Sequence, residues 1–241
     1  MLKLSDLCVS WCKQSALKQL AVIAVIIFST AANAAPYLPL FNDILFADDI
    51  EQIASRPNAY ECSDLYGAEA YCLDRPSYYG IEDLTLVVYS QLTSTAVEMG
   101  SPKPLSIIKS VELSAPLTSF NYNSLLAGLR RDGYVFSYLE VNDQRLDVLA
   151  GLQNLDHKTL DEQMFTLANS TSYRAQRKYL MMDKTTFSRA YREGYRSMKQ
   201  WRNVGEGGDP ESEKDKLATL TIIDDTITVL FEYPFMKPAK P

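Results

Sequence analysis

From about residue 82 onward, hydrophobic and polar positions alternate along several short stretches of the chain. A period of two is typical of a strand with one buried face. It predicts strands at 84–89, 107–113 and 134–141, and a fourth at 146–149 after a polar turn. These strands are the first sign of a sheet.

Between the second and third of these strands, the apolar spacing changes to that of a helix. Apolar residues recur at i, i+3, i+4 and i+7, which places them on one stripe; they are Tyr122, Leu125, Leu126 and Leu129. Asp132 and Gly133 follow and are expected to end the helix. The first regular half therefore consists of strand, strand, helix and hairpin.

The second half shows the same order of patterns. Residues 174–182 are extended and partly apolar, and a helix is expected at 184–201, begun by Thr185 or Thr186. Its buried stripe is predicted to contain Phe187, Ala190, Tyr191, Gly194, Met198 and Trp201.

The end of the chain predicts a hairpin. Residues 217–223 and 228–233 alternate between apolar and polar positions, and Asp224 and Asp225 form the turn between them. The stretch 205–214, rich in glycine and acids, is expected to be a loop.

These patterns predict an α+β fold with antiparallel sheets, each covered by a helix. One interpretation is a tandem repeat of strand-strand-helix-hairpin units, at 81–153 and 154–241. The alternative is one mixed sheet without a repeat. Residues 159–169 are left open, because Thr159 and Glu162 form a capping box for a helix there, whereas the repeat needs an extended segment.

The region before the regular part, residues 35–80, is expected to hold one short helix and a loop with two cysteines. Ile50, Ile53 and Ala54 recur at helical spacing after Asp48 and Asp49, either of which can cap the helix.

The first 34 residues have the three parts of a secretory signal. Lys3, Lys13 and Lys18 precede a short apolar stretch, which ends in small residues before Ala35. We expect cleavage between Ala34 and Ala35. The alternative is a retained membrane anchor, but a spanning helix needs about 20 apolar residues, roughly twice the length of this stretch.

Cleavage changes the charge balance. The whole chain has 24 basic and 30 acidic residues and a net charge of −6, and without residues 1–34 the counts become 21 and 29, or about −8. An acidic chain repels phosphate backbones, which argues against nucleic acid as a partner. No later stretch is long and apolar enough to span a membrane.

Cys62 and Cys72 are the cysteines that would remain after cleavage. In an oxidising compartment such a pair is expected to form a disulfide. Metal binding is the alternative, but it requires two further ligands, and the single histidine, His157, is distant in sequence. We expect no metal and no cofactor.

The sequence offers no recognisable catalytic motif. His157 lies between Asp156 and Lys158 in an expected turn without a nucleophile nearby in sequence, and the glycines at 205–208 lie among acids, which would repel phosphate. Acidic pairs are explained by a helix cap and a hairpin turn. An enzyme with an unrecognised carboxylate-based site is the alternative.

Basic residues are concentrated in one stretch. Residues 174–203 contain nine bases and two acids, a balance of about +7. If 184–201 is one helix, four of the bases share a face; they are Arg189, Arg192, Arg196 and Lys199. This face could bind an anionic envelope partner, such as an acidic protein, lipid head groups or a glycan. The alternative is a solvated or internally paired face.

Together these features predict an exported, non-enzymatic binding or protein-interaction module. The periplasm is the expected location and the extracellular space is the alternative. A structural accessory of a cell-envelope assembly is a further interpretation. The sequence does not identify the ligand.

Overall fold

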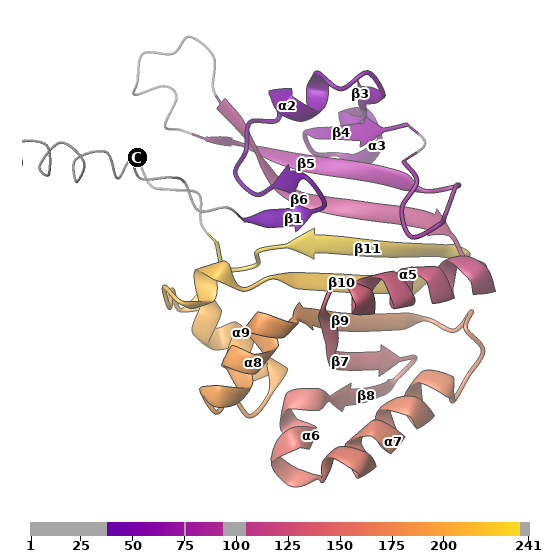
Figure 1. Cartoon of the computed structure of the whole chain (residues 1–241), viewed down its shortest axis with the longest axis vertical. Helices are drawn as coiled ribbons and strands as arrows, with labels where there is room; N and C mark the ends of the chain where they lie inside the picture. Colours follow the sequence, from indigo (N-terminus) through magenta and orange to yellow (C-terminus); the bar gives the residue numbers. More distant parts are fainter. Residues whose placement is uncertain (1–37, 75, 94–104, 237–241) are drawn as a thin grey trace, which may run out of the picture. The chain divides into compact units, whose positions relative to one another are not determined.

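A large antiparallel sheet organises the protein. The computed structural model describes residues 38–74, 76–93 and 105–236. Within them, nine strands form one sheet in the order β3-β4-β5-β6-β11-β10-β9-β7-β8 (Figure 1). The strands are β3 (Ala59–Glu61), β4 (Ala70–Leu73), β5 (Thr85–Thr93), β6 (Leu105–Pro116), β7 (Tyr134–Val141), β8 (Gln144–Asp147), β9 (Arg177–Asp183), β10 (Leu217–Ile223) and β11 (Thr226–Glu232). The expected signal segment and its cleavage site lie outside the described residues.

The C-terminal hairpin occupies the middle of this sheet. In register, Val229 of β11 lies opposite Leu113 of β6 and Leu220 of β10, while Thr219 of β10 lies opposite Leu180 of β9. Strands from both expected units are thus neighbours in one sheet, as in the single-sheet alternative. The α+β class is confirmed, but separate sheets for two units are not found, and the repeat is not confirmed.

Helices and a small two-stranded sheet lie against the large sheet (Figure 1). The two-stranded sheet pairs β1 (Pro39–Phe41) with β2 (Ile44–Leu45). The helices are α2 (Glu51–Ala54), α3 (Ser63–Tyr66), α5 (Ser119–Arg131), α6 (Val148–Asn154), α7 (His157–Asn169), α8 (Lys184–Arg192), α9 (Met198–Glu206) and the 3-10 helix η1 (Ser212–Lys214).

The two faces of the sheet are covered by different helices. In β9, Tyr179 and Met181 belong to the main core, which α5 and α7 cover, whereas Leu180 and Met182 pack in a second cluster with α8 and α9. The alternation follows from the period-two geometry of a strand. Trp201 of α9 is fully buried in the second cluster.

Residues 159–169 are helical, because α7 runs through them. Its N-cap is Asp156, whose side chain accepts a hydrogen bond from the Thr159 backbone N–H at 3.0 Å. The helix thus begins about one turn before the cap expected at Thr159. Residues 159–169 do not form the extended segment that the repeat needs.

The helix expected at 184–201 is two helices. Helix α8 ends at Arg192, and Gly194 then takes a φ of +77°, a left-handed conformation that glycine adopts without steric cost. Ser197 caps the N-terminus of α9, and Asp183 caps α8 in place of the expected Thr185 or Thr186.

A third correction concerns the strand expected at 146–149. Strand β8 ends at Asp147, and Val148 is already the first residue of α6. The Asp147 side chain accepts a hydrogen bond from the Ala150 backbone N–H at 3.1 Å and so caps this helix. The short helix α2 is found where expected, but its N-cap is Ile50 and not Asp48 or Asp49; the Asp49 side chain accepts a hydrogen bond from the Glu51 backbone N–H.

Candidate functional site

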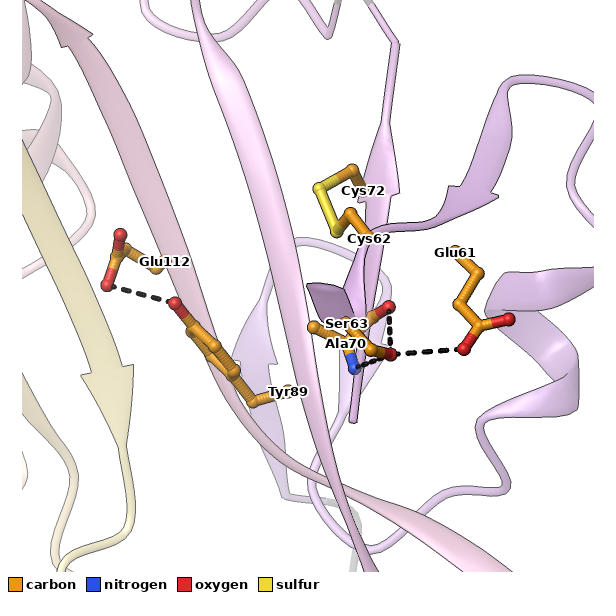
Figure 2. The surroundings of a disulfide bond; sticks show 7 residues. All are labelled: Glu61, Cys62, Ser63, Ala70, Cys72, Tyr89 and Glu112. Atoms are coloured by element: carbon orange, nitrogen blue, oxygen red, sulfur yellow. Dashed lines mark hydrogen bonds between the residues drawn. A yellow bond between two sulfur atoms is a disulfide. The ribbon is translucent and has the colours of Figure 1, made fainter. Parts of the chain in front are cut away.

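The cysteine pair lies at one end of the sheet, where it joins the segment before α3 to β4 (Figure 2). The sulfur atoms of Cys62 and Cys72 are bonded at 2.06 Å and both residues are buried. Nearby, the Tyr89 hydroxyl donates to the Glu112 carboxylate at 3.5 Å. Burial raises the pKa of Tyr89 to about 12. We assign this corner a structural role.

Arg189, the first residue of the predicted basic face, is paired inside the protein. Its guanidinium contacts the buried carboxylate of Asp215 and lies 2.7 Å from Glu193, and its side chain is only 14% exposed. The indole N–H of Trp201 donates to the same Asp215 carboxylate at 2.8 Å. Burial lowers the pKa of Arg189, but hydrogen bonds with Asp215 and Glu193 outweigh that effect and raise it.

The other three basic residues are exposed but do not share one helical face. Arg192 is the last residue of α8, Arg196 lies in the connection and Lys199 is in α9. The four-residue face required a continuous helix, and Gly194 interrupts it. A binding role for the three exposed residues stays a prediction.

A groove is bounded by α5, α6, α7, α8, β7 and β9. It consists of two hollows of about 580 and 620 Å³, which share Arg130, Phe136 and Met164 as lining residues. We call it the α5–α7–α8 groove. Because three residues line both hollows, the two hollows are adjacent.

The first hollow, of about 580 Å³, is lined mainly by apolar side chains, and charged side chains from α5, α7 and α8 also line it. Its apolar wall includes Val148, Leu152, Leu160 and Phe187. His157, Asp161 and Ser188 also line it, but among the described residues no hydrogen bond joins any two of them, so they do not form a catalytic relay. His157 is the exposed first residue of α7, not part of the expected turn.

The second hollow, of about 620 Å³, contains one buried cation. Aromatic side chains from α5, β7, α7, β9 and the α7–β9 connection contribute to its wall; they are Tyr122, Phe136, Phe165, Tyr173 and Tyr179. Arg177 of β9 lines the hollow and is 2% exposed. No aspartate or glutamate lines this hollow.

A third hollow, of about 510 Å³, has the opposite chemistry. Four acids line it at the end of the sheet, namely Asp74, Glu82, Asp83 and Asp225. All four are exposed, and Arg174 pairs with Asp225 at 2.8 Å. In the part of the chain that the structure describes, no group of three or more acids, cysteines or histidine is placed to hold a metal ion.

No helix among the described residues is long and apolar enough to cross a membrane. Comparison of the chain with protein-family models, with curated proteins and with solved structures gave no match. The functional argument therefore depends on the geometry of the groove.

Sequence reasoning counted Arg177 among the basic residues but did not single it out. A local signal existed, because Arg177 shares the period-two position of Tyr179 and Met181, which face the main core. A charged residue at an inward position of a strand is unusual unless it has a structural or binding role. The groove itself left no local signal, since six elements that are distant in sequence form it.

Proposed function

We propose that this protein is an exported, non-enzymatic binding module that holds a small, mainly apolar molecule in the α5–α7–α8 groove. The observation that carries the proposal is the adjacency of the two hollows, which share Arg130, Phe136 and Met164 as lining residues. Ligand sites are typically concave, apolar and of about 300–1,000 Å³, with few polar groups. The signal-like residues 1–34 and the cysteine pair support export.

A neutral, environment-sensitive dye such as Nile red tests the proposal on protein lacking residues 1–34. Its fluorescence should rise on binding and saturate at one dye per chain. Met164, which lines both hollows, is changed to Trp to fill the groove, and this variant should weaken dye binding at least tenfold. The matched control is Gln163→Trp, because Gln163 is exposed on α7 and lines neither hollow.

Equal dye binding by wild type and Met164→Trp would refute the groove as the site. Loss of binding in both Trp variants would show that the effect comes from α7 and not from filling the groove. Melting curves of both variants show whether the substitution has disturbed the fold.

The acidic hollow supports a second candidate, an enzyme with a carboxylate-based site. Its four acids come from the β4–β5 connection and the β10–β11 turn. A carboxyl group that acts as a general acid is normally kept protonated by burial, and these four are exposed. This candidate is therefore second. Hydrolysis of a panel of aryl glycosides, abolished by Glu82→Gln or Asp83→Asn, would favour it over the binding module.

A further inference from the structure

The hydrogen bonds of Arg177 account for four of the five protons of its guanidinium. Nη1 donates to the Ala168 carbonyl at 2.6 Å and to the Tyr179 hydroxyl at 2.8 Å. Nη2 donates to the Thr171 carbonyl at 3.0 Å and to the Ser172 carbonyl at 2.8 Å. Nε is buried and has no hydrogen-bond partner.

These neutral acceptors leave the charge of Arg177 without a counterion. Among the described residues, no carboxylate lies within ion-pair distance of it, and its partners are three carbonyls and one hydroxyl. The Ala168 carbonyl belongs to the last turn of α7, so the helix dipole offsets part of the charge. A buried cation is normally paired with an anion, because burial without a counterion is costly.

Besides the Arg177 Nε–H, the hydroxyl groups of Tyr122 and Tyr179 provide one further hydrogen-bond donor without an acceptor. The hydroxyl groups of Tyr122 and Tyr179 lie 3.3 Å apart, and Tyr179 already accepts from Arg177. Whichever hydroxyl donates to the other, one of the two O–H groups is left without an acceptor in the described structure. The hollow therefore has a positive charge and donors in excess, and its wall has no acid.

The rest of the groove has the same sign of charge. Arg130 lines both hollows and Arg192 lines the first, while Asp161 is the one acid among the lining residues of the two. This basic lining occurs in a chain with a net charge of −6. An anion would be attracted to the groove despite the acidic remainder, because low-dielectric walls focus the local field.

We infer that the ligand of the α5–α7–α8 groove is an amphipathic carboxylate, a fatty or arylalkanoic acid, whose carboxylate sits against Arg177 and the Tyr122–Tyr179 pair. The inference rests on the proposed function, since it takes the groove as the site. The aromatic wall of the second hollow holds the part of the ligand next to the carboxylate, and the apolar first hollow holds the remainder. Charge-assisted hydrogen bonds are stronger than neutral ones, which sets the preference for the acid.

Decanoate and decanamide are the matched probes, because they have nearly the same size and differ in charge at pH 7. Isothermal titration with protein lacking residues 1–34 should show decanoate binding about tenfold or more tightly, as hydrogen bonds to charged groups allow. Arg177→Gln should remove the preference and retain decanamide binding. Arg196→Gln should retain the preference, since Arg196 lines neither hollow.

Equal binding of the two probes would overturn the inference and leave the proposed function standing, whereas failure of Nile red and both probes would end the proposed function. A preference removed by Arg130→Gln or Arg192→Gln but not by Arg177→Gln would also overturn the assignment. If Arg177→Gln does not fold, the Nε–H resonances of wild-type arginines decide the matter. Decanoate, and not decanamide, should shift a solvent-protected resonance, and an unchanged spectrum would contradict the inference.

Discussion

At the scale of single residues, the ion pair of Arg189 and Asp215 differs in burial from the exposed basic residues near it in sequence. The Asp215 side chain is 3% exposed and that of Arg189 is 14% exposed. Burial raises the pKa of the Asp215 carboxyl, while its hydrogen bonds with Arg189 and Trp201 lower it. The pair therefore depends on both partners being present, and removal of one leaves a buried charge.

Arg189→Gln should lower the free energy of unfolding by about 3–5 kcal/mol, because it leaves the Asp215 carboxylate buried without its cation. Arg196→Gln is the control, since this exposed side chain should change stability by less than about 0.5 kcal/mol. Chemical denaturation of the two variants measures both effects. Equal, small losses would show that the Arg189 pair contributes little.

Lys216 provides a pH-dependent contribution to stability. Burial lowers its pKa to about 8, although the nearby charges of Asp183 and Asp132 act in the opposite direction. Its ammonium lies 5.4 Å from the centre of the Tyr134 ring. In the unfolded chain the pKa returns to about 10.4, so between these values the unfolded state binds more protons and stability rises with pH.

Lys216→Met should therefore reduce the rise in stability that wild type shows between pH 7 and 9.5. Relative to the variant, wild type should gain free energy of unfolding across this range, as its Lys216 ammonium loses its proton. Urea denaturation at several pH values provides the measurement. A difference that is constant with pH would contradict the lowered pKa.

At the scale of elements, Asp147 connects two helices. Its Oδ1 accepts from the Ala150 backbone N–H in α6, and its Oδ2 accepts from the Met198 backbone N–H at the start of α9, 2.8 Å away. Each helix begins with N–H groups that have no partner within the helix. One carboxylate thus caps two N-termini that are about fifty residues apart in sequence.

Asp147→Ala should lower the free energy of unfolding by about 2 kcal/mol, since caps contribute about 1 kcal/mol each. Asp156→Ala is the matched control, because Asp156 caps α7 alone and is exposed. Its loss should be clearly smaller. Thermal or urea unfolding of both variants would reveal the order, and equal losses would argue against a shared cap.

Sequence periodicity predicted most elements because their apolar positions face a core. The hairpin of β10 and β11 was located by alternation, and the stripe of α5 by its helical spacing. The break between α8 and α9 was missed, because Ala190 and Trp201 pack in the same cluster and so continue the apolar stripe across the turn at Gly194. Apolar periodicity shows which face of a helix is buried, but it does not show that the backbone of Gly194 turns left-handed and ends the helix.

The site was less predictable than the fold. The groove depends on the relative positions of α5, α7 and α8, which no local pattern specifies. Arg189 and Arg192 belong to the same basic stretch, yet one is paired with Asp215 and the other is exposed. Charge along the sequence could not separate them, because Asp215 is distant in the chain.

At the scale of the whole molecule, the disulfide and the groove lie in different parts of the sheet. Strands β5, β6, β11 and β10 separate β4, which carries Cys72, from β9 and β7 at the groove. Effects at such separated sites usually combine independently. The two regions should therefore respond separately to substitution.

Replacing both Cys62 and Cys72 by Ala should lower the free energy of unfolding by about 2–3 kcal/mol, as expected for a short closed loop. Affinity for Nile red should be unchanged in the folded double variant. Denaturation and dye titration together test both statements. Reduced dye affinity at full folding would reveal coupling across the sheet.

The position of the β10–β11 hairpin also determines when this sheet can close. The chain makes β5 to β9 first, and until residues 217–232 leave the ribosome, β6 and β9 lack the strands that separate them. Each then has an open edge, a known template for intermolecular pairing. A chain that still lacks residues 217–232 would therefore have two strands with open edges, β6 and β9, and such edges make an incompletely folded chain prone to aggregation.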